Sequence, residues 1–212
     1  MAYDAQQTKH LTALLESIPD RVTYRDTPVL REIEQVLTQH LSQEIPADKD
    51  TLSDSVAILR YLGDRYEYLG RFSVAAQFYD RALALAAQLH REFGEETQYA
   101  GDMLYRTLKS HNFYVDDDCQ PLLALCREFI SRTDEIARDA LNPRRHLNHD
   151  PVEMTEAYLA VIDGAEEYVE QNRTLHGHGA CHEAWHLKRE FLLQHNIDWR
   201  SPTVLNPRVL FD

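Results

Sequence analysis

The residues with the clearest capacity for chemistry lie in one short segment, HGHGACHEAWH, which runs from His176 to His186. It contains HEAWH, a match to the HExxH pattern of zinc peptidases, in which two histidines one helical turn apart bind zinc. In that pattern the intervening glutamate acts as general base on the metal-bound water. A zinc site is therefore the first chemical hypothesis for this chain. His176 or His178, in the glycine-flanked loop before the helix, could supply the third ligand and complete a site of His178, His182 and His186.

The helix expected over residues 180–195 would place His182 and His186 on one side, one turn apart. At about 100° per residue the apolar residues, Trp185 among them, fall on the other side, so the histidines face solvent or a neighbouring element. We find no segment typical of a substrate-pairing strand, and no downstream ligand has the spacing of the common zinc peptidase families. The favoured interpretation is that the histidines lie on the surface or pack against a partner. The alternative is a zinc-binding site, and a metal-dependent hydrolase is the least favoured version of that alternative.

The three cysteines, Cys119, Cys126 and Cys181, form an odd set without CxxC spacing. They argue against a disulfide framework and for a reducing compartment. Cys181 stands near a helix start beside His182, where a thiol can have a lowered pKa and act as a nucleophile or redox sensor. Its place on the apolar side of that helix predicts a buried structural cysteine instead. Cys119 and Cys126, two helical turns apart, are expected in the core.

The composition is that of an ordinary globular protein. The chain has 212 residues, 43% hydrophobic and 27% charged, so we expect one domain with a sizeable core, and two small domains are the alternative. A net charge of −13 repels the phosphate backbone and disfavours a nucleic-acid partner. The polar amino terminus has no signal-peptide core, and no window reaches the roughly 18 apolar residues that span a bilayer. A soluble, cytoplasmic protein without a membrane partner is predicted.

The periodicity is helical along nearly the whole chain and predicts an all-α fold. Glycine is scarce, with 7 residues, no run alternates apolar and polar residues, and the prolines fall between the periodic segments. Short connections favour antiparallel neighbours. Thr51, Asp118 and Asp150 are the expected N-caps. The predicted helices cover about residues 4–18, 28–43, 52–69, 72–93, 95–113, 119–140, 151–172 and 180–195.

One helix pair carries a more specific pattern, in the segment LRYLGDRYEYLGRFSVAAQFYDRALALAA. Its marker residues are Leu62, Gly63, Tyr66, Gly70, Ala75, Tyr79 and Ala82. At this spacing the small residues let two helices approach closely and the tyrosines fill the space around them. Over about residues 56–89 the chain thus resembles a tetratricopeptide repeat. It departs from that family at Leu59, where tryptophan is usual, and at Ala87, where proline is frequent. An ordinary αα-hairpin with similar packing is the alternative.

The resemblance implies binding rather than catalysis. Tetratricopeptide repeats are antiparallel helix hairpins that stack into a right-handed superhelix, and the first helix of each pair lines a face that holds a peptide or a partner helix. Carried over by position, Arg60, Asp64, Glu67 and Tyr68 would be the peptide-binding residues. The same charges would also suit an ordinary solvated helix face. The repeat-like core would span about residues 50–140, with degenerate repeats beside the matched pair.

The carboxyl-terminal stretch NIDWRSPTVLNPRVLFD is rich in apolar residues and contains two prolines. The prolines exclude a continued helix and the apolar content excludes a solvated tail, so we expect a non-helical tail that packs back. From Gly179 to Asp212 the ending resembles the carboxyl-terminal signature of uncharacterised bacterial proteins, which implies no activity. The resemblance suggests that Cys181, His182 and Trp185 belong with the tail, with His182 hydrogen-bonded to the returning backbone.

The favoured function is a non-enzymatic protein-protein interaction or scaffold module with a protein or peptide partner and no cofactor. The alternative is a zinc-binding protein that uses the cluster at residues 176–186. The sequence indicates no catalytic residue, no particular process and no oligomeric state.

Overall fold

The computed structural model describes residues 5–41, 48–114, 119–142 and 146–211. Within these ranges every regular element is an α-helix or a 3-10 turn, which confirms the predicted all-α class. None of the described helices is both long and apolar enough to cross a membrane. The elements are, in chain order, α1 (Ala5–Ser17), η1 (Tyr24–Asp26), α2 (Thr27–Leu41), α3 (Lys49–Tyr68), α4 (Phe72–Phe93), α5 (Ala100–Tyr114), α6 (Gln120–Cys126), α7 (Thr133–Ala140), η3 (Pro151–Met154), α8 (Glu156–Asn172), α9 (Ala180–Gln194) and α10 (Pro202–Leu205).

The chain divides into two compact units. The first unit comprises residues 1–111 and 117–142, and the second comprises residues 112–116 and 143–212. Each hydrophobic core is built from residues of one unit alone. The predicted repeat-like core falls mainly in the first unit, and the helices predicted over 151–172 and 180–195 fall with the tail in the second.

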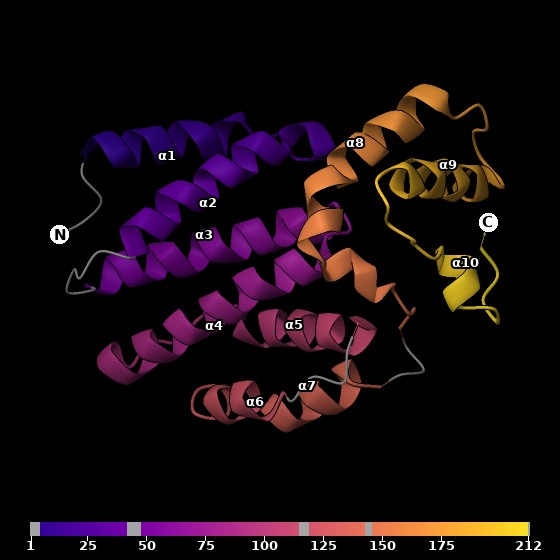
Figure 1. Cartoon of the computed structure of the whole chain (residues 1–212). Helices are drawn as coiled ribbons and strands as arrows, with labels where there is room; N and C mark the ends of the chain where they lie inside the picture. The colour runs from indigo at the N-terminus through magenta and orange to yellow at the C-terminus, as the bar shows by residue number, and fades with distance from the viewer. Residues whose placement is uncertain (1–4, 42–47, 115–118, 143–145, 212) are drawn as a thin grey trace. The chain divides into compact units, whose positions relative to one another are not determined.

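In the first unit the most extensive contact between described helices joins α3 and α4, which lie side by side in Figure 1. The N-cap of α3 is Asp48, whose side chain accepts a hydrogen bond from the Thr51 amide at 2.9 Å, so the predicted cap at Thr51 is wrong. A carboxylate suits this position because it accepts an otherwise unpaired amide and faces the positive end of the helix. Gly70, with a φ of 72°, turns the chain from α3 into α4.

The contact between Gly63 on α3 and Tyr79 on α4 determines how closely these two helices approach each other. A Cβ atom on Gly63 would lie 2.5 Å from Cε1 of the Tyr79 ring, so no larger residue fits there. Tyr79 is fully buried, and nearby Tyr66 stacks on Phe78 with ring centroids 5.4 Å apart. The close approach predicted at Gly63 is confirmed.

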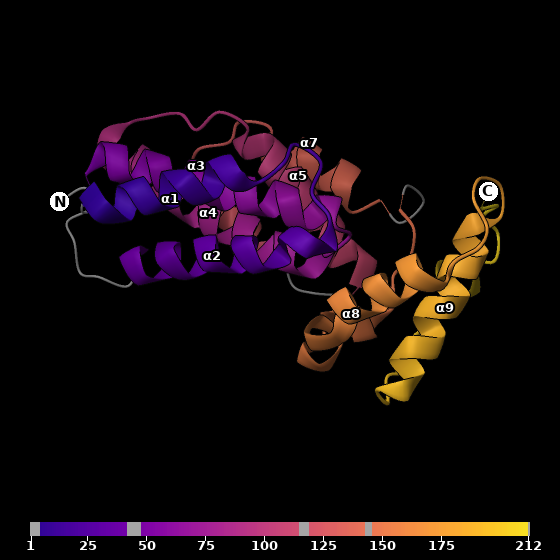
Figure 2. The ribbon, with the colours of Figure 1, turned by 90° about the horizontal axis from the view of Figure 1, so that it is seen from above.

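Around α3 and α4 the first unit is a stack of helices. Figure 1 shows α1 and α2 on the side of α3, with α6 and α7 beyond α4, and Figure 2 shows the same helices from above. Contacts join α1 to α2, α2 to α3, α4 to α6 and α6 to α7. The tetratricopeptide-like superhelix stays a prediction. The largest fully buried aliphatic side chains of this core are Leu30, Ile33, Leu37, Leu59, Leu62, Leu83, Met103, Leu104 and Leu108.

Two helices of the first unit differ from the prediction. The single helix expected over 119–140 is wrong, because residues 127–132 separate α6 from α7. There the Thr133 hydroxyl donates to the Ile130 carbonyl at 2.7 Å, a local side-chain bond that competes with helical pairing. The helix expected from residue 95 begins at Ala100, because Gly94 and Tyr99 have φ values of 68° and 69°. The predicted cap at Asp118 lies outside the described residues.

In the second unit α8 and α9 pack against each other. The single helix expected over 151–172 is wrong, because it is divided at Thr155, whose extended backbone separates η3 from α8. The Thr155 hydroxyl accepts the Tyr158 amide at 3.3 Å and so caps α8. The predicted cap at Asp150 is confirmed at the start of η3. The buried core of this unit consists of Tyr158, Ile162, Ala165, Leu192, Ile197 and Trp199.

The chain that follows α9 packs back onto this core, as predicted. Ile197 is 5% exposed and Trp199 is 1% exposed. The tail is not free of helix, however, because α10 forms one turn with Pro202 at its first position, where the missing proline amide costs nothing. The predicted non-helical tail is wrong at this turn. Leu210, near the end, is 96% exposed and lies outside the packed part.

Candidate functional site

The strongest candidate for a binding surface is the outward side of α3, which carries the four predicted peptide-binding residues. Asp64 and Glu67 both face Tyr79, whose hydroxyl lies 2.8 Å from Asp64 Oδ1 and 3.1 Å from Glu67 Oε2, so the two carboxylates share its single proton as acceptors. These contacts belong to a continuous line of polar side chains that we call the α3 row. The α3 row consists of Arg60, Asp64, Tyr79, Glu67 and Arg106.

Arg106 of α5 forms one end of the α3 row. Its Nη1 donates to Glu67 Oε2 at 2.5 Å, and its Nε donates to Asp102 Oδ2 at 2.9 Å. Burial raises the pKa of the Tyr79 hydroxyl far above its ordinary value, and the neighbouring carboxylates raise it further, so the hydroxyl stays protonated and donates to them. The row therefore fixes the positions of the α3 side chains against α4 and α5.

Arg60 forms the other end of the α3 row, beside a hollow of about 310 Å³. Its Nη2 lies 3.6 Å from Asp64 Oδ2, and its guanidinium carbon lies 4.0 Å from the centroid of the Tyr99 ring. Val56 and Leu89, which are 5% and 4% exposed, supply apolar lining. The hollow is lined by Ser53, Val56, Ala57, Arg60, Leu89, Glu96, Thr97, Gln98 and Tyr99.

Two polar atoms in the lining of this hollow are enclosed and have no hydrogen-bond partner among the described residues. They are Nε of Arg60 and the hydroxyl oxygen of Thr97. An enclosed polar group without a partner costs about 1–3 kcal/mol. Native structures contain few such groups, and an acceptor brought by a bound molecule is one way to satisfy them.

Tyr68 and Tyr99 place exposed aromatic surface along the same side of α3. Tyr68 is 55% exposed and Tyr99 is 49% exposed. Tyr68 lies eight residues beyond Arg60 on α3, or about 12 Å along the helix axis.

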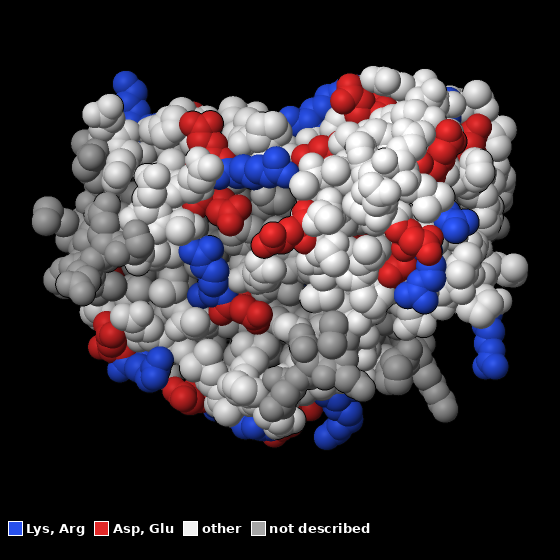
Figure 3. All heavy atoms as spheres, in the orientation of Figure 1, with Lys and Arg blue, Asp and Glu red and all other residues white. Residues whose placement is uncertain are grey.

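Figure 3 shows acidic and basic side chains interspersed over the face drawn there. Sequence reasoning missed Tyr99 because it lies in a loop with a left-handed backbone, where no periodic pattern points to it.

The histidine segment is exposed and does not gather its predicted ligands. His178, His182 and His186 all have exposed side chains. The described residues contain no group of three or more His, Cys, Asp or Glu side chains placed to hold a metal ion. The expected orientation of α9 is confirmed, with His182 and His186 on the solvent side and Leu192 buried. Zinc binding stays an untested alternative for this segment.

Glu183, the glutamate of the HEAWH match, is engaged with the loop that precedes α9. Its Oε2 accepts the amides of Thr174 at 3.0 Å and Leu175 at 2.6 Å, and its Oε1 accepts the Thr174 hydroxyl at 2.7 Å. The Thr174 hydroxyl and the Leu175 amide lower the pKa of this carboxyl group. A general base works best with a pKa near the operating pH and a free lone pair toward its substrate. Glu183 is therefore placed to fix the loop.

His182 and Trp185 hold the end of the tail, as predicted. The Nε2 atom of His182 lies 3.3 Å from the Phe211 carbonyl oxygen, within reach of a hydrogen bond, which confirms the predicted contact with the returning backbone. The Trp185 ring stands edge-on to His182 and to Phe211, with centroids 5.4 Å and 5.1 Å away. Cys181 is predicted to be buried, but it is only half-buried. Cys126 is buried as predicted, and burial raises the pKa of its thiol to about 12.

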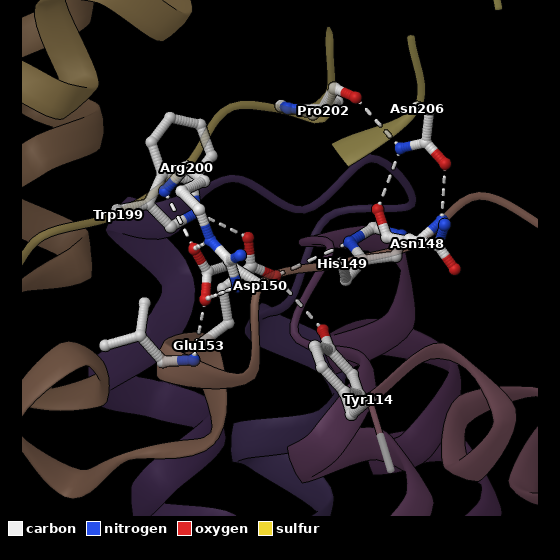
Figure 4. Close-up of polar contacts among 10 residues, drawn as sticks. Tyr114, Asn148, His149, Asp150, Glu153, Trp199, Arg200, Pro202 and Asn206 are labelled. Carbon is white, nitrogen blue, oxygen red and sulfur yellow. Dashed lines mark hydrogen bonds and ion pairs between the residues drawn. The ribbon is translucent and has the colours of Figure 1, made fainter. Parts of the chain in front are cut away.

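A second polar cluster surrounds Glu153 in the second unit (Figure 4). Trp199 Nε1 donates to Glu153 Oε1 at 2.6 Å, and the Tyr114 hydroxyl donates to Oε2 at 3.1 Å. His149 Nδ1 lies 3.5 Å from the same Oε2. Lys188 Nζ lies 4.7 Å from the centroid of the Trp199 ring, and its charge also acts on the carboxylate.

Asp150 binds the tail close to Glu153. Its Oδ2 accepts the Arg200 backbone amide at 2.8 Å and the Arg200 Nε at 3.0 Å. Further along the tail, the Asn206 side-chain amide donates to the Asn148 carbonyl at 2.9 Å and accepts the Asn148 backbone amide at 2.7 Å. Figure 4 shows these contacts joining the 148–153 segment to the tail.

Asp150 and Glu153 are 4% and 9% exposed. Burial raises the pKa of each carboxyl group, but the hydrogen bonds and charges of their neighbours outweigh burial and bring both pKa values below the ordinary ones. Both groups are therefore ionised at neutral pH. We call these two carboxylates with Trp199 and Arg200 the tail-anchoring cluster, because donors of the tail occupy the acidic oxygens. The carboxylate oxygens of Asp150 and Glu153 accept hydrogen bonds from the tail, and this holds the tail in place.

Sequence reasoning found only parts of the tail-anchoring cluster. Asp150 had the pattern of an N-cap and Trp199 that of a buried tail residue, but nothing connected Glu153 to Trp199, 46 positions away. Comparisons with protein-family models, with curated proteins and with solved structures found no match.

Proposed function

We propose that this protein is a non-enzymatic interaction module that binds a peptide or a partner protein on the outward side of α3. The observation that carries the proposal is the stack of Arg60 on Tyr99 at the edge of a hollow of about 310 Å³. Arginine and tyrosine next to a pocket are the residues that most often dominate the energy of an interface. Exposed Tyr68 adds a further aromatic contact on the same helix.

The α3 row supports this proposal because it holds the surface in place before any partner binds. Asp64 and Glu67 are fixed by the Tyr79 hydroxyl, and Arg106 binds Glu67 from α5. Side chains that are already ordered lose less conformational entropy on association. In this proposal Asp64 and Glu67 position the face, whereas Arg60 and Tyr68 contact the partner.

The resemblance to a tetratricopeptide repeat supports the same side of the molecule. In that family the first helix of each pair presents the partner-binding face, and α3 is the first helix of the matched segment. The net charge of −13 favours a partner with a basic surface.

The test is site-specific photocrosslinking in cells of the source organism. A photoreactive phenylalanine analogue replaces Tyr68, and a matched control places the same group at Gln77, which is exposed on α4. We expect a discrete protein adduct from position 68 and none from position 77. Arg60→Ala should lower the yield of that adduct by about tenfold. Equal adducts from the two positions, or no adduct from position 68, would contradict the proposal.

A further inference from the structure

We infer that the hollow beside Arg60 receives one apolar side chain of a partner peptide that carries lysine or arginine next to that side chain. The inference rests on the proposed function and adds the chemistry of the ligand. It follows from three features of the hollow: its apolar lining, the charge at its mouth and its unsatisfied polar atoms.

The size and lining of the hollow suit a single apolar side chain. At about 310 Å³ it lies at the lower end of the range of about 300–1,000 Å³ that is usual for ligand pockets. Val56 and Leu89 are nearly buried, and Ala57 adds a third apolar residue to the lining. Removing one apolar side chain of a partner from water at such a lining is favourable.

The lining of the hollow contains one acidic residue, Glu96, and one basic residue, Arg60. The Glu96 side chain is exposed. Glu96 forms no ion pair among the described residues. Asp64 lies 3.6 Å from Arg60. A lysine or arginine beside the bound apolar side chain would therefore meet the unpaired Glu96 carboxylate, while Asp64 offsets the charge of Arg60.

The unsatisfied polar atoms point to the backbone of the same ligand. Arg60 Nε is a donor, the Thr97 hydroxyl can donate, and both are enclosed without a partner in the lining. An extended peptide that places a side chain in the hollow brings backbone carbonyls to its wall. Small adjustments of the two side chains would then pair these donors with carbonyl acceptors.

The experiment is a selection from a random-sequence peptide library displayed on phage, with the full chain as the target. We expect enriched sequences to share an apolar residue next to lysine or arginine. Synthetic copies of those sequences should bind at least about tenfold more weakly when the apolar residue becomes alanine or the basic residue becomes glutamine. Enrichment of acidic sequences, or of apolar sequences without a basic neighbour, overturns the inference.

Paired variants decide whether the selected peptides bind in the hollow. Ala57→Phe fills the hollow, and Ala84→Phe places the same ring on an exposed position of α4 outside it. Ala57→Phe should weaken binding by at least about tenfold, and Ala84→Phe should leave it unchanged. Glu96→Lys, a change in a loop that requires no repacking, should weaken binding of the basic peptides to a similar extent and more strongly at low salt.

The outcomes separate this inference from the proposed function. Equal binding by the two phenylalanine variants, or unchanged binding by Glu96→Lys, overturns the inference, while a crosslinked adduct from position 68 still supports an interaction module. A selection without enriched sequences overturns the inference as well. The absence of both enriched peptides and adducts overturns the inference and the proposed function together.

Discussion

The α3 row and the tail-anchoring cluster are both networks of hydrogen-bonded charges, but they differ in what surrounds them. In the tail-anchoring cluster Asp150 and Glu153 are almost fully buried, and donors from the tail occupy them. In the α3 row the buried Tyr79 holds two carboxylates from beneath, while Arg60 remains at the surface next to a hollow.

This difference separates two uses of charge in one chain. A buried carboxylate whose donors come from another segment ties that segment down, and removal of a donor leaves an uncompensated charge. In the α3 row the hydrogen bonds to Tyr79 fix Asp64 and Glu67 from the side of α4. The solvent side of the row stays accessible. The second unit thus uses its buried charges to hold its tail, whereas the first unit leaves Arg60 and exposed aromatic surface at the side of α3 where we propose that a partner binds.

The largest effect is expected from Trp199→Ala. Trp199 is 1% exposed and donates to Glu153, so its loss creates a cavity and removes a donor from a buried carboxylate. The free energy of unfolding should fall by about 3–5 kcal/mol in urea titrations followed by circular dichroism. Trp185→Ala is the matched control. Because Trp185 is only half-buried, this variant should lose less unfolding free energy than Trp199→Ala. Equal losses would contradict an anchoring role for Trp199.

Gly63→Ala tests the packing that supports the α3 row. The new Cβ would lie 2.5 Å from the ring of the fully buried Tyr79, and the resulting overpacking should cost about 1–3 kcal/mol in the same titrations. Gly101→Ala is the control on α5, because its Cβ would lie 3.2 Å from one terminal side-chain carbon of Ile136. Alanine is the better helix former, so this control should be neutral or stabilising. Similar losses in both variants would refute the packing argument.

The dependence of stability on pH tests the role of the carboxylates in the tail-anchoring cluster. Because the pKa values of Asp150 and Glu153 are lowered in the folded chain, their stabilisation is fully present above the unfolded value of about 4 and is lost as pH falls through the folded values. Between about pH 6 and about pH 3 the wild-type chain should lose about 1–2 kcal/mol more unfolding free energy than Glu153→Gln. Tryptophan fluorescence follows this change in the second unit, which contains both tryptophans. Parallel pH profiles would count against the assignment.

Tyr68→Ala should have little effect on folding, because Tyr68 is 55% exposed. The free energy of unfolding is expected to change by no more than about 0.5 kcal/mol, whereas Tyr66→Ala, at a position 5% exposed, should cost several times as much. Thermal unfolding by circular dichroism measures both variants. A large loss for Tyr68→Ala would mean that Tyr68 supports the fold and is not kept free for a partner.

The smallest effect is expected from zinc. Because the structure groups no three metal-ligating side chains among the described residues, added zinc should shift the melting temperature by no more than about 1 °C. Metal analysis of protein purified without a nickel column should show no stoichiometric zinc. Stoichiometric zinc that is lost in a His182→Ala, His186→Ala double variant would instead restore the histidine segment as a metal site.

The periodicity of the sequence by itself determined the fold class and much of the helical layout. The helix expected over 72–93 is α4, Phe72–Phe93, because Gly70 and Gly94 mark its limits and apolar residues recur along one side. The same period placed His182 and His186 of α9 toward solvent. Period alone did not find the breaks at 127–132 and at Thr155, because there hydroxyl side chains compete locally with helical hydrogen bonds.

The tertiary structure alone decided which polar residues meet. Tyr79 lies 15 positions from Asp64, and Trp199 lies 46 positions from Glu153, yet each pair shares a hydrogen bond. No spacing rule connects such residues, because their contact depends on how separate helices and a tail pack. The same packing brings Tyr99 from a loop onto Arg60 and creates the hollow beside it. The sequence thus placed Arg60 and Tyr68 on a helix face, and only packing gave that face an aromatic wall and a pocket.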